Sequence, residues 1–329
     1  MNISRRSAMG ASMMGGVLAS MGRPRGVFAQ ALTKNARMVI GWPAGGSTDA
    51  AGRVLAKNMA GYASALTVDN RPGAGGRLGV EHLKTADADG SVFLISPASM
   101  FVIYPHVYQK LSYDPLQDFT AVTRVCKFPF AISVGPAVPA SLKTLPDFVQ
   151  WCRANPREAQ YAIAAAGSGT HFAGVMLARA TGVPLSSVPY KGDAPSIQDL
   201  MGGQIAASIN VLGAVLPQIA SGRLRVLATT GAARSLLTPD VPTVAETHPG
   251  YLAEEWFGTF VPRKTPQDAV ARLNAALQDA LKTAAVRQAF AKLGFEVAGE
   301  SGAAFASIVK ADLERWGPIV KASGFKADE

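Results

Sequence analysis

The chain has 329 residues, of which 48% are hydrophobic, and it carries a formal net charge of +9 at pH 7. This length is enough for two α/β domains with cores of their own. The basic residues form no cluster, so we expect no nucleic-acid partner. A mild excess of positive charge instead favours the approach of anionic solutes.

Residues 1–29 have the organisation of an export signal. Arg5 and Arg6 make the start basic, residues 8–21 are apolar, and residues 27–29 end in a small side chain. The apolar stretch is too short and glycine-rich to span a membrane, and no later apolar run is long enough. We therefore expect removal of this segment and a soluble protein in the periplasm. The arginine pair leaves the twin-arginine and general secretory routes open. The alternative is a cytoplasmic protein with an unstructured basic start.

Residues 37–55 predict a strand, a glycine-rich loop and a helix. The loop Gly41-Trp42-Pro43-Ala44-Gly45-Gly46 follows an apolar run, and a helical pattern starts at Thr48. Ser47 or Thr48 would cap this helix, with Asp49 in its first turn. The free backbone N–H groups at the start of a helix suit an anion such as a carboxylate. An ordinary strand-to-helix turn is the alternative.

The next elements are strands at 66–69 and 92–96 with a helix at 77–85 between them. The loop before this helix looks like a dinucleotide fingerprint, but Leu78 stands where the third glycine is needed. We therefore expect a tight turn and no cofactor there. The second of these strands runs into Ala98-Ser99-Met100, and ligands of open α/β sheets gather at such strand ends.

A second α/β series follows residues 119–134, which can form one long crossing strand. The helix at 145–154 opens with a capping-box pattern at Thr144 and Asp147. A strand at 161–164 then leads into a second glycine loop, residues 165–171, and a helix that ends near Thr181. Like the first glycine loop, this loop lies between a strand and the start of a helix.

The rest of the chain continues the alternation and closes with two amphipathic helices. Strands are expected at 188–190, 206–210, 225–229 and 257–261, and helices ending at Met201 and at 266–283 and 302–322, the last kinked at Gly317-Pro318. Crossings near 127–132 and 254–260 predict two α/β lobes hinged around a cleft. Residues 30–129 and 254–329 would form lobe 1, and residues 130–253 lobe 2.

The inventory of catalytic and metal-binding groups is thin. The four histidines show no metal-ligand spacing, and the chain has no Walker A motif and no nucleophile elbow. Cys126 and Cys152 either pair in an oxidising compartment or remain free thiols. We expect neither a cofactor nor a metal ion.

Backbone donors and small hydroxyls dominate the predicted cleft, and such groups hold a carboxylate directly or through water. Asp49 is expected to turn away from an anionic ligand, to accept hydrogen bonds from loop N–H groups, or to meet a hydroxyl or ammonium group of the ligand, and Asp193 is placed at the cleft edge. The predicted ligand-binding residues are Pro43, Ala44, Gly45, Gly46, Ser47, Thr48, Asp49, Ala98, Ser99, Met100, Gly167, Ser168, Gly169, Thr170, His171 and Asp193.

Six motifs occur in order over nearly the whole of the chain after the export signal. They are Trp42-Pro43-Ala44-Gly45-Gly46-Ser47-Thr48-Asp49, Asn70-Arg71-Pro72-Gly73-Ala74-Gly75-Gly76, Leu111-Ser112-Tyr113-Asp114-Pro115, Val188-Pro189-Tyr190-Lys191-Gly192, Pro239-Asp240-Val241-Pro242-Thr243 and Arg315-Trp316. Together they resemble the Bug family, the solute-binding proteins of tripartite tricarboxylate transporters. The resemblance implies a two-lobed periplasmic-binding-protein fold, type 2-like, without catalysis.

The resemblance also implies a function and a binding mode. A monomeric receptor would capture a small carboxylate solute and deliver it to the membrane permease subunits, with the first glycine loop and residues 167–171 holding the carboxylate. Ala44, Tyr104, Ala206 and Asp193 depart from the family pattern, which leaves the identity of the ligand open.

Two other functions remain open. One is an orphan periplasmic receptor that signals to a sensor protein. The other is an exported α/β hydrolase or lyase that acts on a carboxylate with Asp49, His171 and Asp193 as an acid–base set.

Overall fold

The computed structural model describes residues 33–59 and 61–327. The predicted export signal lies outside these residues. Within them, none of the helices is long and apolar enough to cross a membrane. Both cysteines are buried free thiols, Cys126 on a strand and Cys152 on a helix.

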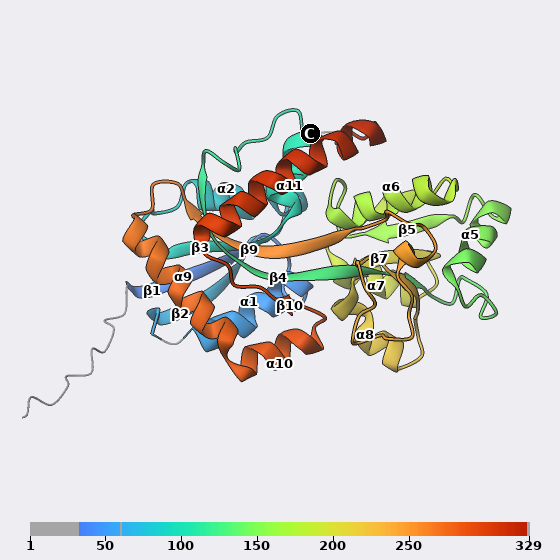
Figure 1. Ribbon diagram of the computed structural model, residues 1–329, viewed down its shortest axis with the longest axis horizontal. Helices are drawn as coiled ribbons and strands as arrows, with labels where there is room; N and C mark the ends of the chain where they lie inside the picture. The colour runs from blue at the N-terminus through green and yellow to red at the C-terminus, as the bar shows by residue number, and fades with distance from the viewer. Residues whose placement is uncertain (1–32, 60, 328–329) are drawn as a thin grey trace, which may run out of the picture. The chain divides into compact units, whose positions relative to one another are not determined.

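One sheet is built mainly from the first third of the chain (Figure 1). Its strands are β2 (Ala63–Asn70), β1 (Thr33–Ile40), β3 (Val92–Pro97), β9 (Glu254–Pro262) and β4 (Phe119–Val134), in that order across the sheet. The first three are parallel, and β9 runs antiparallel to β3 and β4. Every residue of β3 is buried, as expected of a strand that is covered on both faces.

The second sheet continues from the end of β4. Its other strands are β5 (Gln160–Ile163), β6 (Ser186–Pro189), β7 (Ala207–Val211) and β8 (Arg225–Thr229). β4 pairs antiparallel with β7 and β8, while β5 is parallel to β6 and β7. The short strand β10 (Glu296–Val297) pairs with the middle of β4.

The helices lie against both sheets. They are α1 (Ser47–Asn58), α2 (Arg77–Lys84), α3 (Ser99–Val102), α4 (Tyr104–Val107), α5 (Leu145–Ala154), α6 (Gly169–Thr181), α7 (Asp193–Met201), α8 (Leu212–Ala220), α9 (Gln267–Lys282), α10 (Ala284–Lys292) and α11 (Gly302–Ser323), with short 3-10 turns η1 (Ala74–Gly76) and η2 (Val244–Glu246). α1 and α2 pack on the first sheet, and α6 and α7 pack on the second. α11 is one helix that includes Pro318.

The long strand β4 connects the two sheets, which confirms the prediction of one crossing strand. It pairs with β9 from Phe119 to Pro129 and with β7 from Phe130 onward. Pro129, which has no N–H group to give to a ladder, stands where the partner changes. The lobe boundaries at 129/130 and 253/254 remain a proposal, and the change of sheet at Pro129 supports it.

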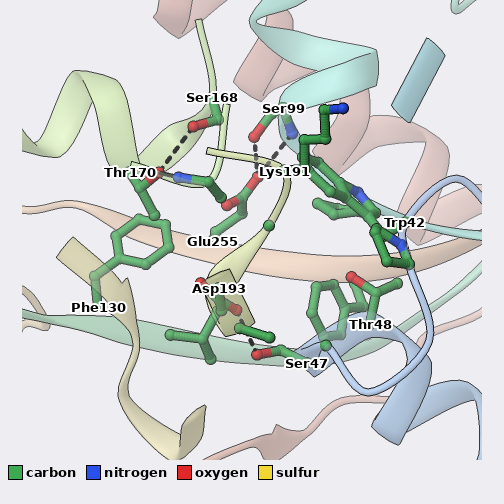
Figure 2. Close-up of a pocket in the computed structure, with 18 of the residues that line it drawn as sticks. Trp42, Ser47, Thr48, Ser99, Phe130, Ser168, Thr170, Lys191, Asp193 and Glu255 are labelled. Atoms are coloured by element: carbon green, nitrogen blue, oxygen red, sulfur yellow. Dashed lines mark hydrogen bonds between the residues drawn. The ribbon is translucent and has the colours of Figure 1, made fainter. Parts of the chain in front are cut away.

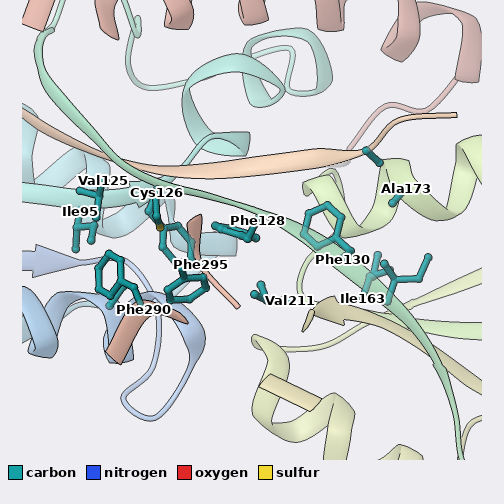
Figure 3. Packing of buried hydrophobic residues seen from close by; sticks show 14 of the residues in the cluster. Ile95, Val125, Cys126, Phe128, Phe130, Ile163, Ala173, Val211, Phe290 and Phe295 are labelled. Atoms are coloured by element: carbon teal, nitrogen blue, oxygen red, sulfur yellow. The ribbon is translucent and has the colours of Figure 1, made fainter. Parts of the chain in front are cut away.

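An aromatic cluster fills the space beside this crossing. Phe128 lies 4.5 Å from Phe257 and 5.3 Å from Phe295 between ring centroids, and 6.2 Å from Phe130 (Figure 3). All four rings are buried. The core therefore extends from β9 and β10 along β4 into the second sheet.

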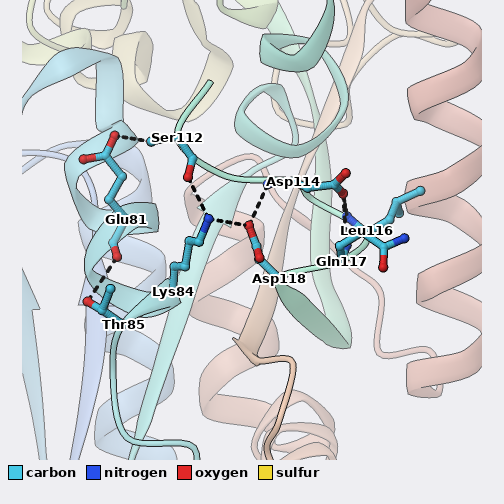
Figure 4. Close-up of polar contacts among 8 residues, drawn as sticks. All are labelled: Glu81, Lys84, Thr85, Ser112, Asp114, Leu116, Gln117 and Asp118. Carbon is cyan, nitrogen blue, oxygen red and sulfur yellow. Dashed lines mark hydrogen bonds and ion pairs between the residues drawn. The ribbon is translucent and has the colours of Figure 1, made fainter. Parts of the chain in front are cut away.

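The segment between α4 and β4 is held by polar contacts (Figure 4). Lys84 at the end of α2 forms a 2.9 Å ion pair with Asp118 and donates to the Ser112 carbonyl at 2.8 Å. Asp114 accepts hydrogen bonds from the backbone of residues 116 and 117. These contacts fix the loop against α2, away from the carboxyl ends of the parallel strands.

Candidate functional site

A pocket lies between the two glycine loops, beside the crossing strands (Figure 2). Its volume is about 70 Å³, which is room for a few water molecules or a small solute. Its lining residues are Trp42, Pro43, Ala44, Gly46, Ser47, Thr48, Pro97, Ser99, Phe128, Phe130, Ala164, Ser168, Thr170, Lys191, Gly192, Asp193, Ala194, Pro195, Val211, Glu255 and Phe257.

Nine of the predicted ligand-binding residues line this pocket. They are Pro43, Ala44, Gly46, Ser47, Thr48, Ser99, Ser168, Thr170 and Asp193. The other seven, Gly45, Asp49, Ala98, Met100, Gly167, Gly169 and His171, lie beside it but do not line it. Gly45 lines a neighbouring groove between α1 and α8. Ala98 and Met100 are buried.

The first glycine loop delivers an uncapped helix start to the pocket. The N-cap of α1 is Gly46, in an extended conformation, and no side chain caps the helix. The expectation of a Ser47 or Thr48 cap was wrong, because the Ser47 hydroxyl donates to Asp193 across the pocket at 2.7 Å. Gly45, at φ +85°, makes the tight turn that only glycine adopts easily.

Asp49 points away from the pocket, as electrostatics requires. Its carboxylate accepts hydrogen bonds from the Gly45 N–H at 2.9 Å, Arg53 Nε at 2.8 Å and Asn70 Nδ2 at 2.9 Å. Burial opposes its ionisation, but these hydrogen bonds outweigh burial and lower the pKa of Asp49. Asp49 thus holds the loop in place and leaves the first-turn N–H groups of α1 open to the pocket.

The second glycine loop uses most of its donors internally. The Gly167 N–H donates to His171 Nδ1 at 3.1 Å, and the Ala164 N–H donates to Thr170 Oγ1 at 3.1 Å. The Gly169 N–H donates to the hydroxyl of Ser99, the first residue of α3, at 3.0 Å. This loop is therefore less open to an anion than the start of α1.

His171 packs behind the pocket wall. Its ring lies 4.4 Å from that of Phe325, edge to face, near the end of the chain. Burial lowers its pKa to about 4, so the imidazole is neutral at physiological pH. Neither His171 nor Asp49 reaches the pocket, so the acid–base set with Asp193 does not come together at one site.

Asp193 lies inside the pocket wall rather than at the cleft edge. Besides the hydrogen bond from Ser47, its carboxylate accepts one from Asn210 Nδ2 at 3.0 Å. Burial raises the pKa of Asp193, against the effect of these hydrogen bonds. Asp193 thus connects α7 to α1 through the hydrogen bond from Ser47.

Glu255 is a pocket residue that the sequence analysis missed. It lies on β9, is 8% exposed and accepts hydrogen bonds through Oε1 from both the backbone N–H (2.8 Å) and the hydroxyl of Ser99. Burial foremost, with Asp193 and Asp312 contributing, raises its pKa to about 7. The sequence analysis expected this strand at 257–261, which leaves Glu255 outside it. If the strand is taken to begin at residue 254, the alternation of side chains places Glu255 on the same face as Phe257.

The remaining wall of the pocket is mostly apolar. It consists of Trp42 from the first loop, Phe128 and Phe130 from β4, Phe257 from β9 and Val211 from β7. Among the described residues that line the pocket, Lys191 at the rim is the one basic side chain, against the two acids Asp193 and Glu255.

Comparison with known proteins decides the family. The profile of the family described as "Tripartite tricarboxylate transporter family receptor" matches residues 51–325. The chain belongs to this family. It is 33% identical over 293 residues to Protein BugT of Bordetella pertussis, which covers 88% of this chain and 89% of that protein.

Solved structures of the same kind have closely similar folds. The Rhodopseudomonas palustris protein Rpa4515, solved with adipate, superposes with a TM-score of 0.85 at 31% identity over 89% of this chain and 98% of that one. MatC from the same organism, with bound malate, gives a TM-score of 0.81 at 27% identity over 87% and 98%. These similarities confirm the two-lobed periplasmic-binding-protein fold and the Bug-family resemblance.

Membership of the tripartite tricarboxylate transporter receptor family also settles the class of function. The family consists of periplasmic solute-binding receptors of transporters, and they are not enzymes. The prediction of a binding protein rather than a hydrolase or lyase is therefore confirmed. Of the four positions expected to depart from the family pattern, Ala44 and Asp193 line the pocket, whereas Tyr104 and Ala206 do not.

Proposed function

We propose that this receptor is exported to the periplasm, captures a small carboxylate solute in the pocket between its two glycine loops, and presents it to membrane permease subunits of a tripartite tricarboxylate transporter. The observation that carries the proposal is the uncapped start of α1 at the pocket wall. The ligands of the two R. palustris relatives, adipate and malate, are carboxylates. Residues 1–29 would be the cleaved export signal.

The carboxylate would bind at the start of α1. The first-turn N–H groups of Ser47 and Thr48 have no side-chain cap, and the positive end of the helix dipole favours a negative charge there. Lys191 at the pocket rim adds a positive charge. Hydroxyls of Ser99, Ser168 and Thr170 provide further polar contacts directly or through water.

The apolar wall sets the character of the rest of the solute. Trp42, Phe128, Phe130 and Phe257 would pack against carbon atoms of the ligand. The proposed ligand is therefore a small acid whose carbon atoms lie against these rings. Large tricarboxylates would bring charges to walls that cannot pair them.

A thermal-shift and calorimetry screen over mono-, di- and tricarboxylates, aromatic acids and amino acids tests the proposal. A solute at 100 times its dissociation constant should stabilise the protein by about 2.7 kcal/mol. The protein recovered with the solute should contain it chemically unchanged. Absence of any shift with every carboxylate class would contradict the proposal.

Export is tested separately. We expect the protein isolated from a periplasmic extract to begin after Ala29. An uncleaved N-terminus in the cytoplasmic fraction would contradict this part of the proposal and leave the binding site untouched.

A further inference from the structure

The position opposite α1 in the pocket already holds a carboxyl group of the protein. Figure 2 shows Glu255 beside Ser99 and Thr170, with Thr48 across the pocket. Glu255 Oε1 accepts two hydrogen bonds from Ser99, and the Ser99 hydroxyl in turn accepts one from the Gly169 N–H at the start of α6. The start of α6 therefore supports the negative charge of Glu255 through Ser99.

The lack of a side chain at Gly169 makes this arrangement possible. A Cβ atom added at Gly169 would lie 2.7 Å from Glu255 Oε2, so any larger residue would displace the carboxyl group. The second glycine loop thus accommodates an acid that is built into the protein. A ligand carboxylate placed there would meet that acid instead of free donors.

The second oxygen of Glu255 is left for the ligand. Oε2 accepts no hydrogen bond from the described residues, although the residue is 8% exposed and lines the pocket. A carboxylate oxygen that faces the pocket without a donor from the protein can accept a hydrogen bond from a ligand. Asp193, by contrast, has donors on both of its oxygens.

Resting on the proposed function, we propose that the pocket selects carboxylates that also carry a protonated amine, and that Glu255 is the specificity residue that binds this amine. The ligand carboxylate lies at the start of α1 and its ammonium donates to Glu255 Oε2. Such a solute is neutral overall, so it brings no further net negative charge to a pocket lined by two acids and one lysine.

Proton binding distinguishes this arrangement from its alternative, a protonated Glu255 that donates to a second ligand carboxylate. Asp193 on α7 and Asp312 on α11 act on Glu255 electrostatically, and Lys191 before α7 lines the same pocket. An ammonium is bound by ionised Glu255, so affinity for it falls as pH is lowered. A ligand carboxylate is bound by protonated Glu255, so its affinity rises as pH is lowered.

Matched pairs of acids test the inference by calorimetry at pH 6 and pH 8. The pairs are alanine with isobutyrate and γ-aminobutyrate with valerate, in which a methyl group replaces the ammonium; adipate and malate complete the set. We expect at least one amine-bearing acid to bind about tenfold or more tightly than its partner, because a charged hydrogen bond is gained, and to bind more tightly at pH 8.

Glu255→Gln should remove that preference, and its matched control Glu254→Gln, on the same strand, should keep it. Equal affinity within both pairs, or an equal loss for both members in Glu255→Gln, would overturn the inference. Binding of adipate or malate alone would overturn it too and leave the proposed function standing. Binding of none of the six acids would overturn the inference, and the wider screen of carboxylate classes would then test the proposed function by itself.

Discussion

Three acidic residues near the pocket differ in what surrounds each carboxyl group. Asp49 is paired with Arg53 outside the pocket wall. Asp193 has neutral donors on both oxygens, and Glu255 has donors on one. Hydrogen bonds lower the pKa of Asp49, whereas burial raises that of Asp193 and Glu255. Sequence alone cannot separate Asp193 from Glu255, because the donors Ser47 and Ser99 come from distant segments.

Gly46→Asp should abolish carboxylate binding without damaging the fold. Position 46 is the N-cap of α1, with φ −82° and ψ 173°, where an Asp side chain accepts hydrogen bonds from the first-turn N–H groups. It would put its own negative charge where the ligand carboxylate is proposed to bind, and should add a few tenths of a kcal/mol of stability. Calorimetry with the best acid of the screen should show at least a tenfold loss.

Gly46→Ala is the matched control for this change. Its Cβ would lie 3.6 Å from the Pro43 carbonyl oxygen, an ordinary contact, and it adds no acceptor. It should therefore bind the same acid within a factor of a few. If Gly46→Asp kept the affinity of the parent, the ligand carboxylate would not bind at the start of α1.

At the scale of elements, regular patterns were predictable, whereas short helices that follow another element with almost no loop were not. The strand, loop and helix of residues 37–55 became β1 and α1, and the capping box at Thr144 and Asp147 is formed in α5. α8 and α10 were missed. Each has nine residues; α8 follows β7 without a break and contains Pro217, and α10 follows α9 after Thr283 alone. α2 and α7 are as short and were predicted, because a glycine-containing loop precedes each of them; no such loop marks the start of α8 or α10.

The pocket was predictable where it rests on local sequence. A glycine-rich sequence before a helix indicates free backbone donors, and this pattern predicted Gly46, Ser47 and Thr48. The walls come from Phe128, Phe257 and Glu255 on the crossing strands. An alternating pattern shows that such residues are buried, but register decides which cavity they face, and register depends on partner strands far along the chain.

Closure around the solute should depend on the contact between α1 and α7. The Ser47 hydroxyl donates to Asp193 at 2.7 Å between the two proposed lobes. Solution scattering should show a smaller radius of gyration with a saturating acid than without it, as β4 and β9 absorb the rotation. Ser47→Ala should weaken affinity about tenfold, because a buried charged acceptor loses its donor.

Ser307→Ala is the control, since that exposed serine bonds only within α11. It should match the parent in affinity and in scattering. A radius of gyration that stays constant on binding would mean a rigid pocket. Unchanged affinity in Ser47→Ala would mean that this hydrogen bond is not part of the bound state.

For the whole molecule, two buried groups act on stability in opposite directions as pH changes. Burial raises the pKa of Glu255 from 4.5 to about 7, so the folded state binds more protons than the unfolded state between these values, and this contribution falls as pH rises. Burial lowers the pKa of His171 from 6.5 to about 4, so its contribution falls as pH drops through that range. The two ranges overlap almost completely.

We therefore expect the contributions of Glu255 and His171 to the unfolding free energy of the ligand-free protein, each about 3 kcal/mol in full, nearly to cancel between pH 4.5 and 6.5. Denaturant titrations should show that Glu255→Gln becomes more stable relative to the parent as pH rises toward 7. His171→Asn, whose side chain can still accept from the Gly167 N–H, should gain relative to the parent as pH falls toward 4. The test compares the slope of the unfolding free energy against pH, since each substitution also shifts the absolute value of that free energy. If either variant kept the slope of the parent, that group would have the same pKa in the folded and unfolded chains. For Glu255, a pKa raised to about 7 would then be wrong.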